Sequence, residues 1–323
     1  MNKFRLYFVL FSLSIVLFSC VPDDTEVVPL RDYAEQYATD KAMIEDYLKT
    51  YYIKIVNHPG YPDDQDIILT KYLQDDPEMT LIWDSPYLKS KEVEMHGITY
   101  KIYYIQSRVG DLENGEAPST VDQVLSSYEG NYLKYVTTTV DGAAVTNLDD
   151  IPFESVEYPQ QWLGLDFTIK GWTEIFPLFH TGTYNEGSNP NDPAQYNDFG
   201  AGVMFLPSGL GYYAAGSFEI PAYSPLVFTF KLYDVKHIDH DEDGILSNDE
   251  DINHDGIFND DTDGDGTYNI YDKDDDGDGK LTKNEIKNAE GVVYDFDSIP
   301  DCSGNTTDPT RVKRYLDKTC FKD

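Results

Sequence analysis

Carboxylates alternate along two short stretches in the C-terminal third of this 323-residue chain. Each stretch has aspartates at positions one, three and five, a glycine at position six and a glutamate at position twelve. Such a turn supplies the several oxygen ligands that a hard cation like Ca²⁺ prefers. The expected ligands of the first stretch are Asp239, Asp241, Asp243, the carbonyl of Ile245, Ser247 through water, and Glu250. Those of the second are Asp274, Asp276, Asp278, the carbonyl of Lys280, Thr282 and Glu285.

Partial copies of the same pattern lie between the two stretches. Asp251 and Asp261 each begin such a copy, but Thr262 stands where the first copy needs its closing glutamate. The run resembles EF-hand loops and, because helices are poorly signalled around it, the calcium-dependent thrombospondin type 3 repeats. We therefore expect residues 237–290 to form calcium-binding acidic repeats. A disordered acidic linker is the alternative, since the segment has few apolar residues.

The N-terminus has the layout of an export signal. Lys3 and Arg5 precede an apolar run that ends at Cys20, and this run is too short to span a membrane as a mature helix. The sequence LFSC at its end resembles the lipobox of bacterial lipoproteins, which implies removal of residues 1–19 and lipidation of Cys20. We expect residues 20–31 to be a tether, and the protein to be anchored by lipid to the outer membrane of the cell envelope, on its periplasmic or surface face. An ordinary signal peptide with a chance cysteine is the alternative.

The other two cysteines, Cys302 and Cys320, lie close together near the C-terminus. In an exported protein, two thiols that close a short loop favour a disulfide. We expect this disulfide to close a small cap over residues 291–323, with two free thiols as the alternative.

The remaining chain predicts an α+β domain. Apolar residues at spacings of three and four indicate a helix over 32–51, within an N-terminal helical extension at 32–96. The pattern becomes strand-like from Thr80, with a short helix expected at 172–179 and a long loop between residues 128 and 153. Strands arranged around one short helix predict an antiparallel sheet.

Four segments in the middle of the chain carry a more specific resemblance. They are GITYKI from Gly97, YEG from Tyr128, IKGW from Ile169 and LVFTF from Leu226. In this order they resemble FKBP-type peptidyl-prolyl cis–trans isomerases over residues 97–236. The resemblance implies an FKBP-like antiparallel sheet wrapped on a short helix, with a pocket between the two.

The same resemblance implies which residues form the pocket. Trp172 would be its floor, and Glu154 stands where the family has an aspartate. The family's tyrosine donor aligns with Gly211, so Tyr212 lies one residue beyond that position. The complete expected set is Tyr128, Phe153, Glu154, Ile169, Trp172, Tyr212, Ile220 and Phe228.

Isomerisation in such a pocket needs neither a nucleophile nor a cofactor. A peptide bond has partial double-bond character and a rotation barrier of about 18–20 kcal/mol. The planar amide is more polar than the twisted one, so an apolar aromatic site favours the twisted state. The implied substrates are proline-containing exported polypeptides.

The net charge of the chain limits the kinds of partner that it can bind. A formal net charge of −35, from 59 acidic and 24 basic residues, argues against nucleic acid, whose phosphates need a basic surface. Three functions remain open: an envelope-tethered isomerase, an FKBP-like domain that binds a partner without catalysis, and a structural surface lipoprotein stiffened by calcium.

Overall fold

The structure, a computed structural model, describes residues 29–72, 77–185, 195–217 and 219–321. The chain divides into two units, Met1–Asp32 and Tyr33–Asp323. The expected signal peptide and the lipidation site Cys20 lie outside the described residues. No helix in the described part of the chain is both long and apolar enough to cross a membrane.

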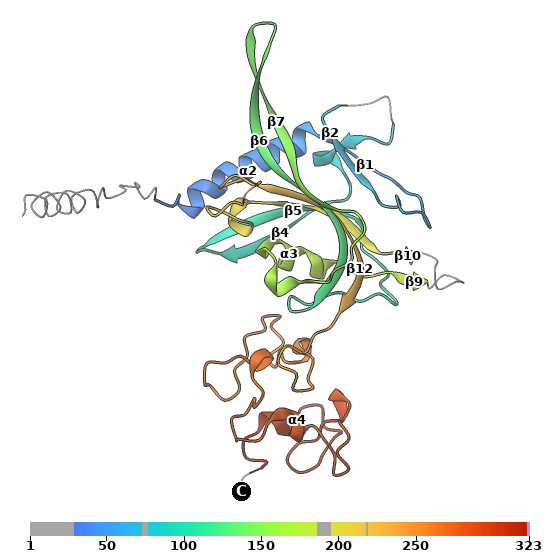
Figure 1. The fold of residues 1–323 in the computed structure, drawn as a ribbon, viewed down its shortest axis with the longest axis vertical. Coiled ribbons are helices and arrows are strands. Elements are labelled where there is room, and N and C mark those ends of the chain that lie inside the picture. The colour runs from blue at the N-terminus through green and yellow to red at the C-terminus, as the bar shows by residue number, and fades with distance from the viewer. Residues whose placement is uncertain (1–28, 73–76, 186–194, 218, 322–323) are drawn as a thin grey trace, which may run out of the picture. The chain divides into compact units, whose positions relative to one another are not determined.

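A seven-stranded antiparallel sheet organises the second unit (Figure 1). Its strands follow the order β4-β5-β11-β12-β6-β7, and the short strand β8 pairs with β6. The bounds are β4 (Leu88–Met95), β5 (Ile98–Arg108), β6 (Gln123–Val140), β7 (Ala143–Val156), β8 (Leu163–Gly164), β11 (Gly200–Leu206) and β12 (Leu226–Lys236). The expected mixed α and β fold, with an antiparallel sheet and few helices, is confirmed.

Helices cover both faces of this sheet. Leu206 of β11 packs in one apolar core with Trp172 of α3 (Lys170–Ile175). Its neighbour Phe205 packs in the other core, against α2 (Tyr33–Thr50). Successive side chains of a strand point to opposite faces, so a strand covered on both sides must be apolar throughout. All seven residues of β11, with the sequence GAGVMFL, are buried.

Two small sheets complete the strands of the described chain. The first, in the order β2-β1-β3, follows α2 and shares its core, and the second is the hairpin of β9 and β10. Their bounds are β1 (Tyr52–Ile55), β2 (Ile67–Thr70), β3 (Thr80–Leu81), β9 (Thr183–Asn185) and β10 (Gln195–Asn197).

The long loop expected between residues 128 and 153 is instead a β-hairpin. Strands β6 and β7 pair from Tyr128 and Val156 up to Val140 and Ala143. The turn residues Asp141 and Gly142 both have positive φ, at 50° and 82°. An Asp-Gly pair in this conformation joins two strands with the twist that the sheet requires. The Asp-Gly signal is therefore the feature that distinguishes a hairpin from a loop here.

The expected boundary between residues 96 and 97 falls in the turn between β4 and β5, which pair along their length. Strand β4 belongs to the same sheet as the rest of the domain, although it lies in the stretch expected to be a helical extension. Its sequence, LKSKEVEM, is highly charged, and Val93 is its one buried residue. This is typical of an edge strand, whose hydrophobic pattern is weak.

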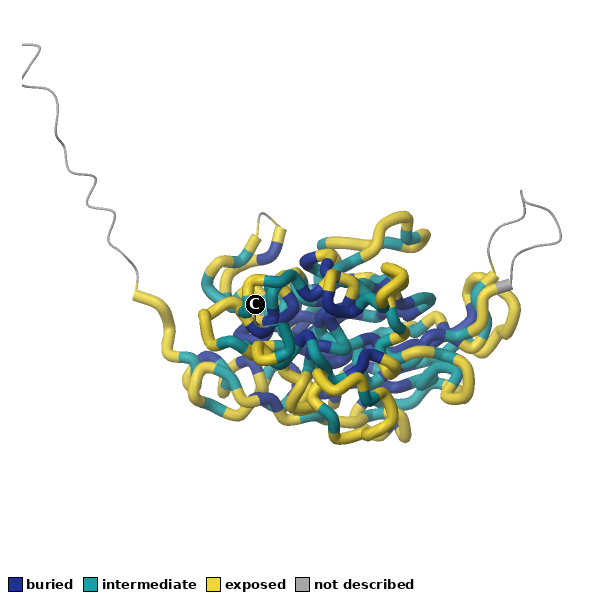
Figure 2. The backbone as a smooth tube through the Cα atoms, turned by 90° about the horizontal axis from the view of Figure 1, so that it is seen from below, coloured by how far each residue is buried: buried dark blue, intermediate teal, exposed yellow. Residues whose placement is uncertain are grey.

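The acidic tail after β12 is built mainly from turns. Its one α-helix is α4 (Thr282–Glu285), among residues 237–321. Four loops share one hydrogen bond, in which the backbone N–H of the glycine at position six donates to the carboxylate of the aspartate at position one, at 2.9–3.0 Å. These aspartates are Asp239, Asp251, Asp261 and Asp274. Figure 2 shows buried and exposed residues alternating at short intervals along the chain, and such alternation occurs within the tail loops.

Candidate functional site

An aromatic cluster lies between the sheet and α3. Trp172 of α3 contacts Tyr128 of β6 and Phe228 of β12 in edge-to-face geometry, with ring centroids 5.0 and 5.3 Å apart. Phe153 of β7 meets Phe228 in the same way at 5.6 Å. Edge-to-face pairs at these distances are favourable beyond the area they bury. Four of the expected pocket residues are therefore in mutual contact.

The sheet register brings these rings together. Phe228 of β12 pairs with Gly130 of β6, and Gly130 pairs with Glu154 of β7. A Cβ at Gly130 would lie 2.6 Å from the ring of Phe153 and 2.7 Å from that of Phe228. Only glycine leaves enough room at this position for both rings to close over the strand.

A cavity of about 330 Å³ opens beside the cluster. Four expected site residues line it together with two others: Phe153, Glu154, Tyr212, Ile220, Ser217 and Glu219. Tyr212 is 37% exposed, whereas Ile220 is buried. The cavity thus has an aromatic wall, an aliphatic wall, and a phenol and two carboxyl groups for polar contacts.

Trp172 lies behind this cavity rather than on its lining. It is 4% exposed and is enclosed by Tyr128, Phe228 and Phe176. Its indole N–H is buried and has no hydrogen-bond partner among the described residues. Ile169 precedes α3, packs against the same core, and accepts a backbone hydrogen bond from Trp172 at 2.9 Å.

Glu154 sets the electrostatics of the cavity. Burial, together with a hydrogen bond to Glu154 and the negative charge of that carboxylate, raises the pKa of the Tyr128 hydroxyl far above its ordinary value. Burial and the same carboxylate also raise the pKa of Tyr212. Both phenols therefore keep their protons at neutral pH and are available as donors.

Helix α2 holds the loop that carries Tyr212. Asp40 is 1% exposed and accepts hydrogen bonds from the backbone N–H and the hydroxyl of Ser208, at 2.8 and 2.6 Å. The amide of Gln36 donates to the other oxygen of Asp40 at 2.6 Å. The turn Ser208–Leu210 begins the segment that leads to Tyr212, so a buried carboxylate of the N-terminal helix positions one wall of the cavity.

The acidic tail forms a second candidate site. Carboxylate oxygens lie within 4.8 Å of one another in four groups along the tail. The groups are Asp239, Asp241 and Asp243; Asp261, Asp263 and Asp265; Asp274, Asp276 and Asp278; and Asp243, Glu250 and Asp275. Two groups are the aspartates expected from the sequence. Glu250, however, is grouped with Asp243 and Asp275.

Many of these oxygens are buried without a partner in the described chain. Unpaired oxygens belong to Asp241, Asp243, Glu250, Asp274, Asp275, Asp276, Asp278 and Glu285, and both oxygens are unpaired in each of the two glutamates. A buried carboxylate without a hydrogen bond or counter-charge is costly. The donor set, made of hard oxygens at short spacing, therefore fits a divalent cation such as Ca²⁺.

Burial and crowding shift these carboxyl groups strongly. Burial, followed by the negative charges of Asp275, Asp243 and Asp241, raises the pKa of Glu250 to about 10. Burial and the charge of Asp243 raise the pKa of Asp275 to about 9. Burial and neighbouring aspartates raise the pKa of Glu285 to about 8. Each group needs a proton or a cation to be stable where it lies.

The residues at position nine make hydrogen bonds within their own loops. The hydroxyl of Ser247, which is expected to act through water, lies 2.8 Å from Nδ1 of His240. The hydroxyl of Thr282 likewise donates to Asp275 at 3.1 Å. Position nine thus bonds to position two of its own loop, because the loop folds back on itself there. Ile245 and Lys280 each donate a backbone N–H to the aspartate at position five, Asp243 or Asp278, at 2.7 Å.

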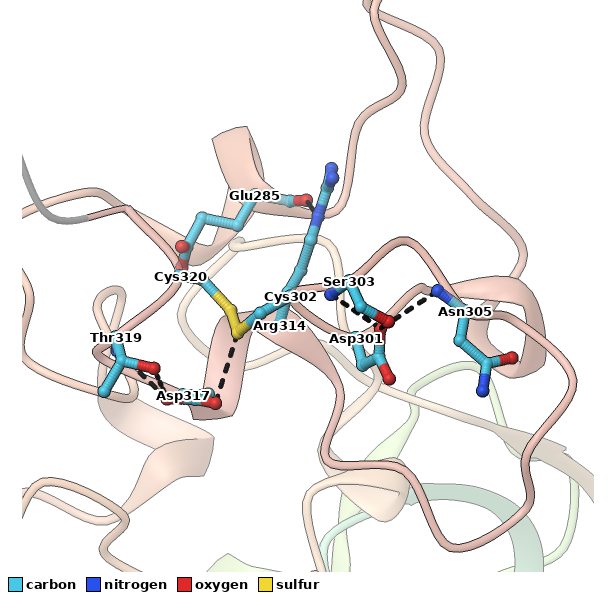
Figure 3. Close-up of a disulfide and its surroundings, with 9 residues drawn as sticks. All are labelled: Glu285, Asp301, Cys302, Ser303, Asn305, Arg314, Asp317, Thr319 and Cys320. Atoms are coloured by element: carbon cyan, nitrogen blue, oxygen red, sulfur yellow. Dashed lines mark hydrogen bonds between the residues drawn. A yellow bond between two sulfur atoms is a disulfide. The ribbon is translucent and has the colours of Figure 1, made fainter.

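The C-terminal cap packs on the tail. Cys302 and Cys320 form a disulfide with Cα atoms 4.9 Å apart (Figure 3). The guanidinium of Arg314 donates hydrogen bonds to the backbone carbonyls of Glu285 and Lys287. Tyr315 is fully buried in an apolar cluster with Ile245, Ile286 and Ile299. The cap therefore contacts both expected calcium loops.

Two residues of the tail site have no signal in the loop pattern. Asp275 stands at position two, which is not a ligand position of the pattern. Tyr315 lies in the cap, and burial together with the charges of Asp275, Glu250 and Asp243 raises the pKa of its hydroxyl well above the ordinary value. The unbroken run of aspartates Asp274–Asp276 is the one sequence feature that could have indicated a role for Asp275.

Comparisons with known proteins give likenesses for both parts of the chain. A family model described as the BamM C-terminal region matches residues 240–309. A peptidyl-prolyl cis–trans isomerase from Pseudomonas syringae pv. tomato is similar in structure, with 17% identity, a TM-score of 0.33 and coverage of 64% of this chain and 98% of that one.

FkpA from Escherichia coli is similar at 20% identity and a TM-score of 0.31, covering 73% of this chain and 74% of its own. None of the curated proteins matches. At such TM-scores the likenesses assign neither an activity nor a ligand to this chain.

Proposed function

We propose that the sheet domain is a peptidyl-prolyl cis–trans isomerase acting on exported polypeptides. The observation that carries the proposal is the cavity lined by Phe153, Tyr212 and Ile220, which adjoins the rings of Tyr128 and Phe228. A proline ring fits an aromatic wall, and an apolar environment lowers the cost of losing amide planarity.

Donors at the cavity would act on the carbonyl oxygen of the substrate. Tyr212 lines the cavity and keeps its proton. A phenol O–H can hold that oxygen in place while the C–N bond turns, so that the two sides of the amide rotate relative to each other. The carboxylate of Glu154 orients the hydroxyl of Tyr128 next to it.

A prolyl-peptide isomerisation assay tests this proposal. Replacing Phe228→Ala or Trp172→Leu should lower kcat/KM by about tenfold or more, because each variant removes about 1.4 kcal/mol or more of transition-state stabilisation. Trp83→Leu is the matched control, because Trp83 is 38% exposed and packs near Tyr103, away from this cluster. Equal rates with and without the wild-type protein would instead favour a domain that binds a partner without catalysis.

We also propose that the tail binds structural calcium. The buried oxygens without partners support this, as does the positive φ of Gly244 and Gly279, at 102° and 94°, which lets the loops turn sharply around an ion. Asp239, Asp241 and Asp243 would hold one ion, and Asp274, Asp276 and Asp278 another. The ion would supply the positive charge that lets these carboxylates lie together.

Calcium titration followed by circular dichroism tests this second proposal. Removing the metal should loosen the tail, because its crowded carboxylates then repel one another. Returning calcium should restore the signal with a dissociation constant on the order of 10⁻⁴–10⁻³ M, as in extracellular modules. An unchanged spectrum up to about 10 mM calcium would contradict it.

We further propose that the protein is anchored to the membrane by lipid attached to Cys20. The lipobox-like sequence LFSC supports this, and the tether at residues 20–31 would let the domain reach polypeptides near the outer membrane. Metabolic labelling with a fatty acid should mark the wild-type protein and leave Cys20→Ser unlabelled. Equal labelling of the two would contradict the anchor.

A further inference from the structure

One group of carboxylates in the tail joins residues that the loop pattern keeps apart. Asp243 and Glu250 belong to the first loop and Asp275 to the second, yet one oxygen of each lies within 4.8 Å of the others. Calcium–oxygen bonds are about 2.3–2.6 Å long, so oxygens bound to the same ion are separated by at most about 5 Å. The spacing of the three oxygens therefore suits a single ion.

The burial of this group is nearly complete. Asp243, Glu250 and Asp275 are each 1% exposed. Both oxygens of Glu250, Oδ2 of Asp243 and Oδ1 of Asp275 are buried without a hydrogen-bond partner in the described chain. Buried carboxylates are paired or bind metals, and these oxygens have no pairing within the described residues.

The two carboxylate oxygens of Asp275 differ in their hydrogen bonding. Its Oδ2 accepts a hydrogen bond from the hydroxyl of Thr282 in its own loop at 3.1 Å. Its Oδ1 is the unpaired atom. The other aspartates of the second loop, Asp274, Asp276 and Asp278, form a separate group. The side chain of Asp275 is thus fixed by its own loop, and its Oδ1 has no partner in the described chain.

The equivalent position in the other loops carries no carboxylate. Position two is His240 in the first loop, where the ring bonds to Ser247 and to Asp166. It is Thr262 in the loop that begins at Asp261, where it bonds to Asn269. An aspartate at this position is therefore a property of the second loop, not of the repeat.

We propose that Asp275 binds the same divalent cation as Asp243 and Glu250, so that one ion joins the first and second loops of the tail. The proposal rests on calcium binding by the tail and adds a ligand that the loop pattern does not assign. It explains why Glu250 faces Asp275. The buried hydroxyl of Tyr315 in the cap has no partner in the described chain, and it lies near enough to feel the charges of Asp275, Glu250 and Asp243.

The test compares Asp275→Asn with Glu242→Gln in the full mature chain. Asparagine keeps the shape of the side chain and can still accept from Thr282, but it lacks the charge. Glu242 is exposed at position four of the first loop, so Glu242→Gln removes the same charge outside the group. Calcium affinities are measured by competition with a chromophoric chelator, and thermal midpoints are measured with and without calcium.

Asp275→Asn should weaken one class of calcium site by about tenfold or more relative to Glu242→Gln, because affinity depends on the number of charged ligands. The calcium affinity of the other class of site should be unchanged. The order of the thermal midpoints should reverse with calcium. Without calcium Asp275→Asn should be the more stable variant, since it removes a carboxyl group that the unfolded chain keeps ionised and that is costly to bury. With calcium it should be the less stable variant.

Three results would overturn the inference. Calcium affinities of Asp275→Asn equal to those of Glu242→Gln would leave calcium binding intact but remove Asp275 from the site. An Asp275→Asn variant that is less stable both with and without calcium would show a role in packing alone. A wild-type protein that binds no calcium would overturn both this inference and the calcium proposal on which it rests.

Discussion

At the scale of single residues, Tyr212 is the group that most directly separates catalysis from binding. It lines the cavity, and its phenol is protonated at neutral pH. Tyr212→Phe should lower kcat about fivefold with little change in KM, because one hydrogen bond worth about 1 kcal/mol is made mainly in the transition state.

The control is Tyr213→Phe, since the ring of Tyr213 stacks on Tyr33, and Tyr213 is not among the residues that line the cavity. Steady-state kinetics of both variants with a proline peptide provide the measurement. Equal losses of kcat in the two variants would contradict a specific role for the Tyr212 hydroxyl.

The carboxyl groups of the tail predict an unusual pH dependence. Glu250 and Asp275 have pKa values raised to about 10 and about 9 in the metal-free fold, against ordinary values near 4. Between the ordinary pKa near 4 and the raised pKa of each group, the folded state binds more protons than the unfolded state. The stability of the folded state therefore falls as pH rises through this range. Thermal unfolding of the metal-free tail should therefore show a lower midpoint at pH 8 than at pH 5.

Calcium should reverse or flatten this dependence. A bound cation takes the place of the protons, so deprotonation no longer carries the cost of burying unpaired charges. Midpoints measured at the two pH values with saturating calcium serve as the comparison. A metal-free tail that becomes more stable from pH 5 to pH 8 would contradict the burial of these groups.

The sequence alone identifies much of both sites at this scale. The aspartates at positions one, three and five are recognisable because their chemistry requires a fixed spacing. Asp275 and Tyr315 are not, because their roles arise from loops and a cap that meet only in the folded chain. Trp172 was expected as a floor, and its position behind Tyr128 and Phe228 depends on packing that no local pattern encodes.

At the scale of secondary-structure elements, α2 supports the cavity from the opposite face of the sheet. Asp40→Ala would leave the N–H and hydroxyl of Ser208 and the amide of Gln36 without this acceptor. We expect a loss of about 3 kcal/mol in the free energy of unfolding, since buried donors are costly to leave unpaired. Isomerase activity should fall with it, because the segment leading to Tyr212 loses its anchor.

Asp46→Ala on the same helix is the control for this prediction. Asp46 bonds to Tyr135 at an exposed site, so its loss should cost well under 1 kcal/mol. Urea unfolding of the two variants gives the comparison. Similar free energies for both would contradict the structural role of Asp40.

Elements differ in how well the sequence predicts them. The helix expected at 32–51 is α2, because its apolar spacing is regular. The helix expected at 172–179 starts earlier, at Lys170, and ends at Ile175, where the tighter turn Phe176–Leu178 that contains Pro177 follows it. The strand-like pattern from Thr80 covers β4. The β6–β7 hairpin was expected to be a long loop, because an exposed hairpin buries few apolar residues.

At the scale of the whole chain, contacts join the end of the sheet to the tail. His237 follows β12 and bonds to the buried Asp122 at 3.0 Å. Burial lowers the pKa of His237, but the hydrogen bond with Asp122 and the negative charges of Asp122 and Glu116 outweigh this and raise it. His240 of the first loop lies 3.2 Å from Asp166 of the sheet domain.

Sheet and tail nevertheless have separate apolar cores, and the proposed calcium sites all lie in the tail. Chelating calcium should therefore lower the unfolding temperature of the tail and leave that of the sheet domain nearly unchanged. Differential scanning calorimetry with and without chelator should show two transitions, of which the smaller one moves. One transition that shifts as a whole would contradict independent cores.

The central claim is that the aromatic cavity beside Trp172 binds and isomerises prolyl peptides. The chain has three tryptophans, and two of them, Trp83 and Trp162, are 38% exposed while Trp172 is 4% exposed. Their indole N–H signals in an NMR spectrum of the protein therefore give one probe beneath the cavity and two exposed reference signals.

The decisive measurement is an NMR titration with a proline peptide that populates both isomers. We predict that the Trp172 signal shifts, that those of Trp83 and Trp162 stay in place, and that the cis and trans signals of the peptide exchange faster than the uncatalysed tens of seconds. An unmoved Trp172 signal with exchange at the uncatalysed rate would contradict the account.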